Sequence, residues 1–411
     1  MRRAASPVGL TTVMCLAQIA GMAGFATFLS LLPDFINLWQ LSNTEAGWIN
    51  GVFYIGYMAA VPILVSLTDR LHPKNAYFFA AAVTAVSSLG FAFAEGFWSA
   101  LILRALAGIG LAGTYMPGLK LLTDHIGGRA QSRAIAFYTS SFGVGASLSI
   151  LLAGEIDARL DWQATFALMA LGPVIAVLII QFLVPPGDPR GHPTPSTHLL
   201  DFRPVLRCRA AMAYVVAYAV HNFELFAVRG WIVAYLVFAE STHPEPRPAW
   251  WSATVLAAIF NLFGVPSSIV GNEIAYRFGQ YRMIVTTMIL SGAAAVAVGL
   301  AVDSALWIVV VLCAVHATLI GGESATVTAG AITNAPEGYK GATMAVHSTL
   351  GFVGSFLGPL VFGIALDFNG SGETLASWHG AFATIGLAML AGPLAILWLG
   401  RPAAPKAESA P

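Results

Sequence analysis

The sequence predicts an all-α membrane protein with twelve transmembrane helices in two six-helix bundles, related by a pseudo-twofold repeat. Hydrophobic residues make up 57% of the 411 residues and charged residues only 10%, whereas a soluble domain carries about a quarter charged residues. Twelve apolar stretches are each close to the ~20 residues that span about 30 Å of hydrocarbon. Basic residues are concentrated in alternate connections between these stretches, which is typical of a multi-pass membrane protein.

In the N-terminal half, each apolar stretch predicts one membrane helix. The first stretch follows Arg2 and Arg3. It is longer than the apolar core of a secretory signal and lacks a convincing small-residue cleavage site, so we expect it to be retained. The six predicted helices cover residues 10–32, 46–66, 76–94, 97–121, 134–153 and 163–184.

The C-terminal half repeats this pattern. Its interior glycines and prolines are tolerated in membrane helices, where small residues allow close packing. A proline-rich stretch that begins at Pro185 separates the halves and is typical of a semi-flexible tether. We therefore divide the chain into an N-terminal bundle (1–184), a cytoplasmic linker (185–209) and a C-terminal bundle with a short cytoplasmic tail (210–411). The predicted helices of the second bundle cover residues 210–239, 249–270, 283–302, 304–333, 341–366 and 377–400.

The distribution of basic residues predicts the orientation of the helices. If both termini are cytoplasmic, the inner loops and tails hold fifteen lysines and arginines, and the outer loops hold only Arg159 and Arg247. Such an excess on one side follows the positive-inside rule. We expect a multi-pass protein of the bacterial cytoplasmic (inner) membrane, with both termini in the cytoplasm.

The two halves also align with each other. A shift of 208 residues places Gly113 on Gly321 and Gly143 on Gly351, each pair in an equivalent predicted helix. Internal repeats of this kind occur in secondary transporters, which bind substrate between the repeats near the middle of the membrane.

Three short motifs resemble those of the major facilitator superfamily. The loop after the second helix contains Asp69-Arg70 followed by Lys74, and the loop after the eighth helix contains Arg277 and Arg282. The fourth helix contains an Arg-x-x-x-Gly-x-Gly pattern. Its members are Arg104, Gly108 and Gly110, and Gly113 follows them.

The resemblance to this superfamily implies a twelve-helix secondary carrier, with the subfamily unassigned. It implies that Asp69, Arg70 and Arg277 belong to a cytoplasmic gate and that the glycines of the fourth helix serve close helix packing. It also implies that the fourth, seventh and tenth helices line a central cavity.

Four charged residues fall well inside predicted helices: Arg104, Glu224, Arg229 and Glu323. An ionised side chain at the centre of a membrane helix costs about 2.5–3.5 kcal/mol, so such residues are expected to face the bundle interior and to be functional. The opposite signs also allow a purely structural interpretation, in which they form two buried ion pairs.

Polar neighbours lie at helical spacing from these charges. His221 precedes Glu224 by three residues, and His316 precedes Glu323 by seven, so each pair shares a helix face. We expect Glu323 to carry a coupling proton with His316 tuning it, and Glu224 to be the alternative site. The candidate substrate- and proton-binding residues are Arg104, Tyr115, His221, Asn222, Glu224, Arg229, His316 and Glu323.

Several function classes lack sequence support. The chain has no phosphate-binding Gly-Lys-Ser/Thr loop and no His-Glu-x-x-His or Gly-x-Ser-x-Gly motif, so we expect neither an enzyme nor a bound cofactor. The three cysteines are scattered and do not suggest a metal site. Lysine plus arginine equals aspartate plus glutamate at 20 each, so no nucleic-acid partner is expected.

The sequence therefore favours a secondary transporter that works by alternating access, coupled to protons through buried carboxyl groups. A small organic anion or metabolite is the favoured substrate. A proton-driven efflux pump for drugs or other hydrophobic or cationic compounds is the alternative, as is a transporter-like sensor that binds without carrying. The expected partners are the substrate, protons and the lipid bilayer, with the monomer as the functional unit.

The predicted topology can be tested with single cysteines at Ser196 in the linker and Ser371 in the last outer loop. An impermeant thiol reagent applied to intact cells should label Ser371→Cys and leave Ser196→Cys unlabelled, because only the former faces outward. Labelling of Ser196→Cys but not of Ser371→Cys would show that the predicted orientation is inverted.

Overall fold

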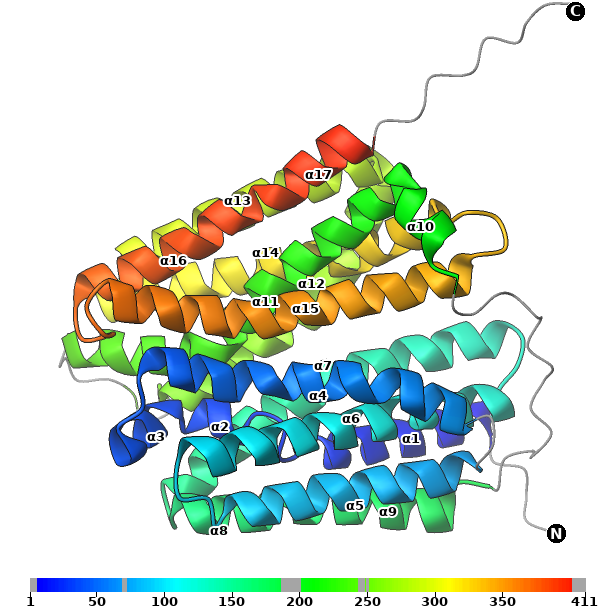
Figure 1. Ribbon diagram of the computed structural model, residues 1–411, viewed down its shortest axis with the longest axis horizontal. Helices are drawn as coiled ribbons and strands as arrows, with labels where there is room; N and C mark the ends of the chain where they lie inside the picture. The colour runs from blue at the N-terminus through cyan, green and yellow to red at the C-terminus, as the bar shows by residue number, and fades with distance from the viewer. Residues whose placement is uncertain (1–5, 69–71, 186–200, 243–247, 249–250, 401–411) are drawn as a thin grey trace, which may run out of the picture.

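The structure is a computed structural model that describes residues 6–68, 72–185, 201–242, 248 and 251–400. The part of the chain that it describes folds into helices joined by short connections and contains no strand (Figure 1). The helices of the N-terminal half are α1 (Pro7–Gly21), α2 (Thr27–Ser30), α3 (Leu32–Trp39), α4 (Asn43–Thr68), α5 (Pro73–Phe91), α6 (Phe97–His125), α7 (Arg129–Asp157), α8 (Trp162–Met169) and α9 (Leu171–Leu183).

The remaining helices are α10 (Arg203–Arg207), α11 (Arg209–Thr242), α12 (Ala253–Phe278), α13 (Gln280–Leu300), α14 (Leu306–Thr333), α15 (Lys340–Phe368), α16 (Leu375–Met389) and α17 (Ala391–Leu399). The short helix α10 lies inside the stretch 185–209 that the sequence predicts as a linker. Local sequence explains many of the helix starts. Asp161 caps α8 by accepting from Ala164 N at 2.7 Å, and Ser252 accepts from Val255 N at 3.3 Å at the start of α12.

The prediction of one continuous helix over residues 10–32 is wrong. The chain leaves the helix after Gly21 and resumes it only at α2 and then α3. Gly21 and Gly24 fall at this break, and glycine is the weakest helix former apart from proline. Two other predicted helices have a single-residue interruption, at Ala170 between α8 and α9 and at Leu390 between α16 and α17.

The molecule has the surface of a protein embedded in lipid. Among the described residues, nine helical stretches are long and apolar enough to cross a membrane. Large apolar side chains point outward on many of them, including Trp98, Phe182 and Leu387, each more than 65% exposed. Water would penalise such a surface, whereas hydrocarbon does not. The chain is a multi-pass integral membrane protein.

Helices α1–α9 lie together in the lower part of Figure 1, and α11–α17 lie together in the upper part. The two sets meet where α4 packs on α15 and α7 packs on α12. The left end of the view, with α3, the start of α4 and the end of α15, is called the α3 end below. The right end, with α10, is called the α10 end.

Glycines allow the helix backbones to approach one another closely. A Cβ atom on Gly108 of α6 would overlap the carbonyl oxygen of Phe53 on α4, and one on Gly110 would overlap Thr84 on α5. Gly113 is also buried in α6. Two of the three motif glycines therefore lie at helix crossings where no larger residue fits.

Candidate functional site

A cavity of about 700 Å³ lies between the two sets of helices. Its wall combines side chains of α4, α6 and α7 with side chains of α11, α12, α14 and α15. Lining residues nearer the α10 end, such as Ala136, Thr139 and Asn272, are exposed, whereas Ile232, Val298 and Phe382 at the other extreme are buried. The cavity therefore opens toward the α10 end and is closed at the α3 end.

Aromatic rings form much of this wall. Some of them contact one another across the boundary between the two sets of helices. The ring centres of Tyr54 and Phe226 are 4.5 Å apart, and those of Tyr57 and Phe352 are 4.3 Å apart. Such a surface accommodates a ligand with a large apolar body. The aromatic lining residues are Phe25, Phe53, Tyr54, Tyr57, Tyr115, Phe142, Tyr218, Phe226, Phe260, Phe352 and Phe382.

Arg229 is the one lysine or arginine among the described residues that line the cavity. Its guanidinium lies over the ring of Phe226 at 4.9 Å, and Nε donates to Asn261 Oδ1 at 2.8 Å. Asn261 in turn donates through Nδ2 to Ser147 Oγ at 2.7 Å and to Gly143 O at 3.1 Å. Arg229 is therefore held in place through a contact that reaches from α12 to α7 in the other half of the molecule.

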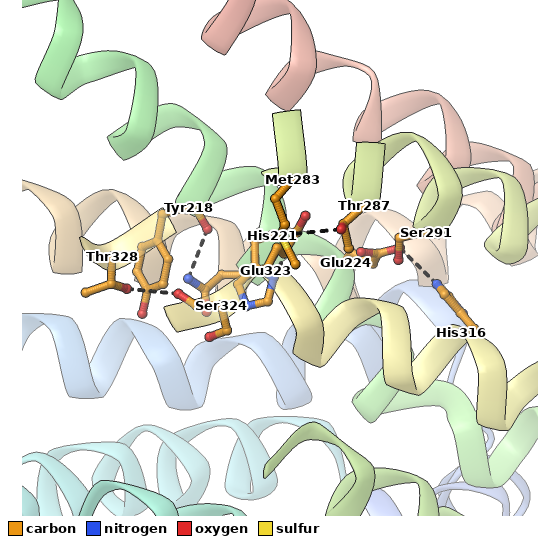
Figure 2. Close-up of polar contacts among 11 residues, drawn as sticks. Tyr218, His221, Glu224, Met283, Thr287, Ser291, His316, Glu323, Ser324 and Thr328 are labelled. Atoms are coloured by element: carbon orange, nitrogen blue, oxygen red, sulfur yellow. Dashed lines mark hydrogen bonds and ion pairs between the residues drawn. The ribbon is translucent and has the colours of Figure 1, made fainter. Parts of the chain in front are cut away.

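Two histidine–glutamate pairs cross-link α11 and α14 next to the cavity (Figure 2). His221 Nδ1 lies 3.2 Å from Glu323 Oε1, and His316 Nε2 lies 2.8 Å from Glu224 Oε1. Ser291 of α13 also donates to Glu224 Oε1 at 2.8 Å. Both carboxyl groups are fully buried, and Oε2 of each has no hydrogen-bond partner among the described residues.

The pairing differs from the one that the sequence predicts. His316 contacts Glu224, not Glu323, and Glu323 contacts His221. Residues seven apart on one helix are separated by about 10 Å along its axis, whereas a neighbouring antiparallel helix brings side chains within hydrogen-bond distance. Glu323 therefore has His221, and not the expected His316, as its direct partner.

The other predicted site residues divide into cavity-lining and non-lining groups. Tyr115, His221, Asn222, Arg229 and His316 line the cavity. Glu224 and Glu323 do not line it, although the histidines that contact them, His316 and His221, do.

Arg104 lies apart from this cavity. Its Nη1 donates to Phe25 O at 3.1 Å, and the guanidinium lies 4.6 Å from the centre of the Phe53 ring. Phe25 and Phe53 line the cavity, so their rings separate Arg104 from it. The side chain is 2% exposed, and Nε and Nη2 have no hydrogen-bond partner among the described residues.

The predicted cytoplasmic gate is only partly visible. Asp69 and Arg70 lie outside the described residues. Arg277 forms an exposed ion pair with Glu273 one turn earlier on α12, at 2.9 Å. Elsewhere in the described ranges, no group of three or more histidine, cysteine, aspartate or glutamate side chains is arranged to hold a metal ion.

Sequence reasoning missed Asn261, Ser147 and Ser291. Each is an uncharged polar residue in a membrane helix, and a residue of that kind more often bonds to its own backbone. Asn261 could have been suspected only because it lies on the eighth predicted helix, which follows the seventh helix that carries Arg229.

Comparison with known proteins supplies the family context. A model described as Major Facilitator Superfamily matches residues 14–359 and also residues 252–411. Human protein spinster homolog 1 is 23% identical over 274 residues, which are 64% of this chain and 52% of that protein. The niacin transporter NiaP of Acinetobacter baylyi is 24% identical over 159 residues, 39% of this chain and 36% of that protein. The matched region thus spans about half the length, or less, of these curated relatives.

Solved structures show the same fold at low identity. A bacterial homolog of the human lysosomal transporter Spinster, in an inward-facing and unoccupied conformation, matches with a TM-score of 0.72 and 14% identity, covering 97% of this chain and 95% of that one. The nucleoside transporter NupG matches with a TM-score of 0.76 and 13% identity, covering 96% of this chain and 100% of that one.

The crossed pairing makes a quantitative prediction about stability. In a double-mutant cycle, His221→Ala and Glu323→Gln should be non-additive by about 0.5–3 kcal/mol, because the two residues are in contact. His316→Ala and Glu323→Gln should be additive to within about 0.5 kcal/mol. Thermal or denaturant unfolding of the single and double variants in detergent measures both values. Coupling of Glu323 to His316 but not to His221 would restore the pairing along one helix.

Proposed function

The chain belongs to the major facilitator superfamily, as its motifs predicted, and from that membership we propose that it is a proton-coupled secondary transporter of small organic anions. Transport follows from the family, whereas the coupling ion and the substrate class are our proposals. Alternating access exposes the cavity to each side of the membrane in turn.

The observation that carries the substrate class is the position of Arg229 in a wall of aromatic rings. The described lining residues include this one arginine and no carboxylate. A guanidinium whose Nε is held by Asn261 presents its other donors to a carboxylate or phosphate. The aromatic wall suits the apolar body of the same molecule. A cationic drug would meet an uncompensated positive charge here, so the cavity favours the anion over the efflux alternative.

Proton coupling is supported by the two histidine–glutamate pairs. Each places a titratable ring at the cavity surface and a carboxyl group directly behind it. An imidazole ring can accept a proton at one nitrogen while the other nitrogen donates, so each histidine can pass a proton between cavity water and its glutamate. We propose Glu323 as the coupling site, now with His221 as its partner, and the pair formed by Glu224 and His316 as the alternative.

We further propose the arrangement of the whole chain: twelve crossings in two six-helix bundles, within the divisions 1–184, 185–209 and 210–411. The interrupted helices support this count, since α8 with α9 and α16 with α17 each form one apolar span. Basic side chains support cytoplasmic termini. Lys74 donates to a carbonyl at the end of α9, and Arg209 donates to one at the end of α17, so both lie at the α10 end. By the positive-inside rule, the α10 end, where α1 begins and α17 ends (Figure 1), is then the cytoplasmic one. The bacterial inner membrane and a monomeric unit remain part of the proposal.

Roles outside the cavity complete the proposal. Arg104 is needed for transport, because a buried cation without an acidic partner among the described residues is costly and is retained only where it contributes to function. Asp69, Arg70 and Arg277 serve the cytoplasmic gate, and the glycines of α6 set its packing distance.

The function is tested by uptake into proteoliposomes. Purified protein is first screened by thermal shift against aromatic and aliphatic monocarboxylates, nucleosides and quaternary amines, with niacin included because one relative is named for it. The compounds that stabilise the protein are then offered as labelled solutes with an imposed proton gradient. We expect uptake of an organic anion, with loss in Arg229→Gln and little change in the control Arg159→Gln, whose ion pair with Glu155 is exposed. Uptake confined to cationic amines would contradict the anion proposal, and binding without uptake would indicate a sensor.

Coupling is tested with Glu323→Gln in the same vesicles. Glutamine mimics the protonated acid, so accumulation driven by a pH step should fall to the level of protein-free vesicles, while exchange of labelled for unlabelled solute continues. Glu224→Gln is the matched comparison on α11. If Glu323→Gln still accumulates solute after a pH step while Glu224→Gln does not, the coupling site is Glu224.

A further inference from the structure

At the α3 end, one carboxylate joins the two halves of the molecule. Asp367 lies at the end of α15, and Asn43 and Thr44 begin α4 (Figure 1). Oδ1 of Asp367 accepts from Asn43 N at 3.1 Å and from Asn43 Nδ2 at 2.8 Å. Oδ2 accepts from Thr44 N at 2.8 Å and from Thr44 Oγ1 at 2.6 Å. Four donors of the N-terminal half thus converge on one side chain of the C-terminal half.

The hydrogen bonds to Asp367 are favourable because they join a carboxylate to the N-terminus of a helix. The first amides of a helix have no partner within the helix, and the helix dipole favours a negative charge beside them. Ordinarily a residue of the same helix supplies that cap. In α4, Ser42 supplies such a local cap to the amide of Glu45 at 3.2 Å. The two amides before it, those of Asn43 and Thr44, are instead bound by the carboxylate from the other half, with charge-assisted bonds to both at once.

The neighbouring backbone shows that this is the closed end. A Cβ atom on Gly47 of α4 would overlap the carbonyl oxygen of Pro359 on α15, one on Gly51 would overlap Phe356, and one on Gly363 would overlap Asn43. The side-chain amide of Asn43 also donates to Ser371 O at 2.9 Å. α4 and α15 are therefore in close contact at this end, while the cavity opens at the other.

We propose that Asp367 is a gating residue for transport, which caps α4 only while the α3 end is closed. The inference rests on the proposed alternating access. For the cavity to open at the α3 end, α4 must separate from the end of α15, and all four hydrogen bonds to Asp367 must break together. The carboxylate then returns to water, and the amides of Asn43 and Thr44 lose their acceptor. The strength of this one contact sets the ratio of the two open forms.

Asp367→Asn tests the role with little change of shape. The amide retains one acceptor oxygen but presents an N–H group to the two Thr44 donors and removes the charge. In a variant lacking Cys15, Cys208 and Cys313, spin labels at the exposed positions Leu160 and Glu373 report the separation of the halves at this end. Double electron–electron resonance should show a population at longer distance. Its ratio to the short-distance population should be about tenfold higher than in the protein with Asp367 intact.

Asp161→Asn is the matched control. Asp161 also caps a helix with its carboxylate, but the helix is its neighbour α8 in the same half. It should lower stability without changing the distance distribution. Thr44→Val removes one of the four donors and should shift the distribution in the same direction as Asp367→Asn, by a smaller factor.

An unchanged distribution in both Asp367→Asn and Thr44→Val would overturn the gating role. So would an equal shift in Asp161→Asn, because the effect would then reflect general loosening. Uptake by wild-type vesicles is measured separately. Absence of uptake would contradict the proposed function, whereas the distances judge Asp367 by themselves.

Discussion

Hydrocarbon offers no hydrogen bonds, and this constraint governs where each buried polar group of the molecule can lie. The backbone meets it by forming helices throughout the described ranges. The side chains meet it by pairing across helices, as His221 does with Glu323 and Arg229 with Asn261. Close packing at glycines contributes as well, because side chains on two helices can form hydrogen bonds only where the helix backbones approach each other.

The polar contacts are distributed unevenly between the two sets of helices. The histidine–glutamate pairs lie wholly among α11, α13 and α14, so they can persist while the halves move. Asn261 and Asp367 instead bond across the boundary, to Ser147 and to Thr44. In the alternating access that we propose, contacts of the first kind would be kept throughout the cycle. Contacts of the second kind depend on the relative position of the halves, and Asn261 ties one of them to the arginine that faces the cavity.

Much of this organisation could be predicted from the sequence, because apolar length and the positions of basic residues are local properties. The breaks at Gly21 and Gly24 were not predicted, since membrane helices tolerate glycine and only the surrounding packing decides whether it ends one. The four intramembrane charges were identified from their cost alone. Their partners could not be, because spacing along one helix says nothing about which neighbour faces it. His316 shows this limit, and so does Asp367, which at the end of a helix resembles an ordinary surface residue.

In each histidine–glutamate pair the imidazole lines the cavity and the carboxyl group does not. This order affects which ion the pair can bind. Alkali metal ions prefer several oxygen ligands and bind imidazole nitrogen poorly. In this cavity an imidazole is met first and the carboxylate stands behind it, so a sodium ion entering with water would find nitrogen in its path and no shell of oxygens. A hydrogen ion needs neither, because it can join one ring nitrogen while the other passes a proton onward. In the coupling that we propose, this order of the two groups favours hydrogen ions over sodium ions.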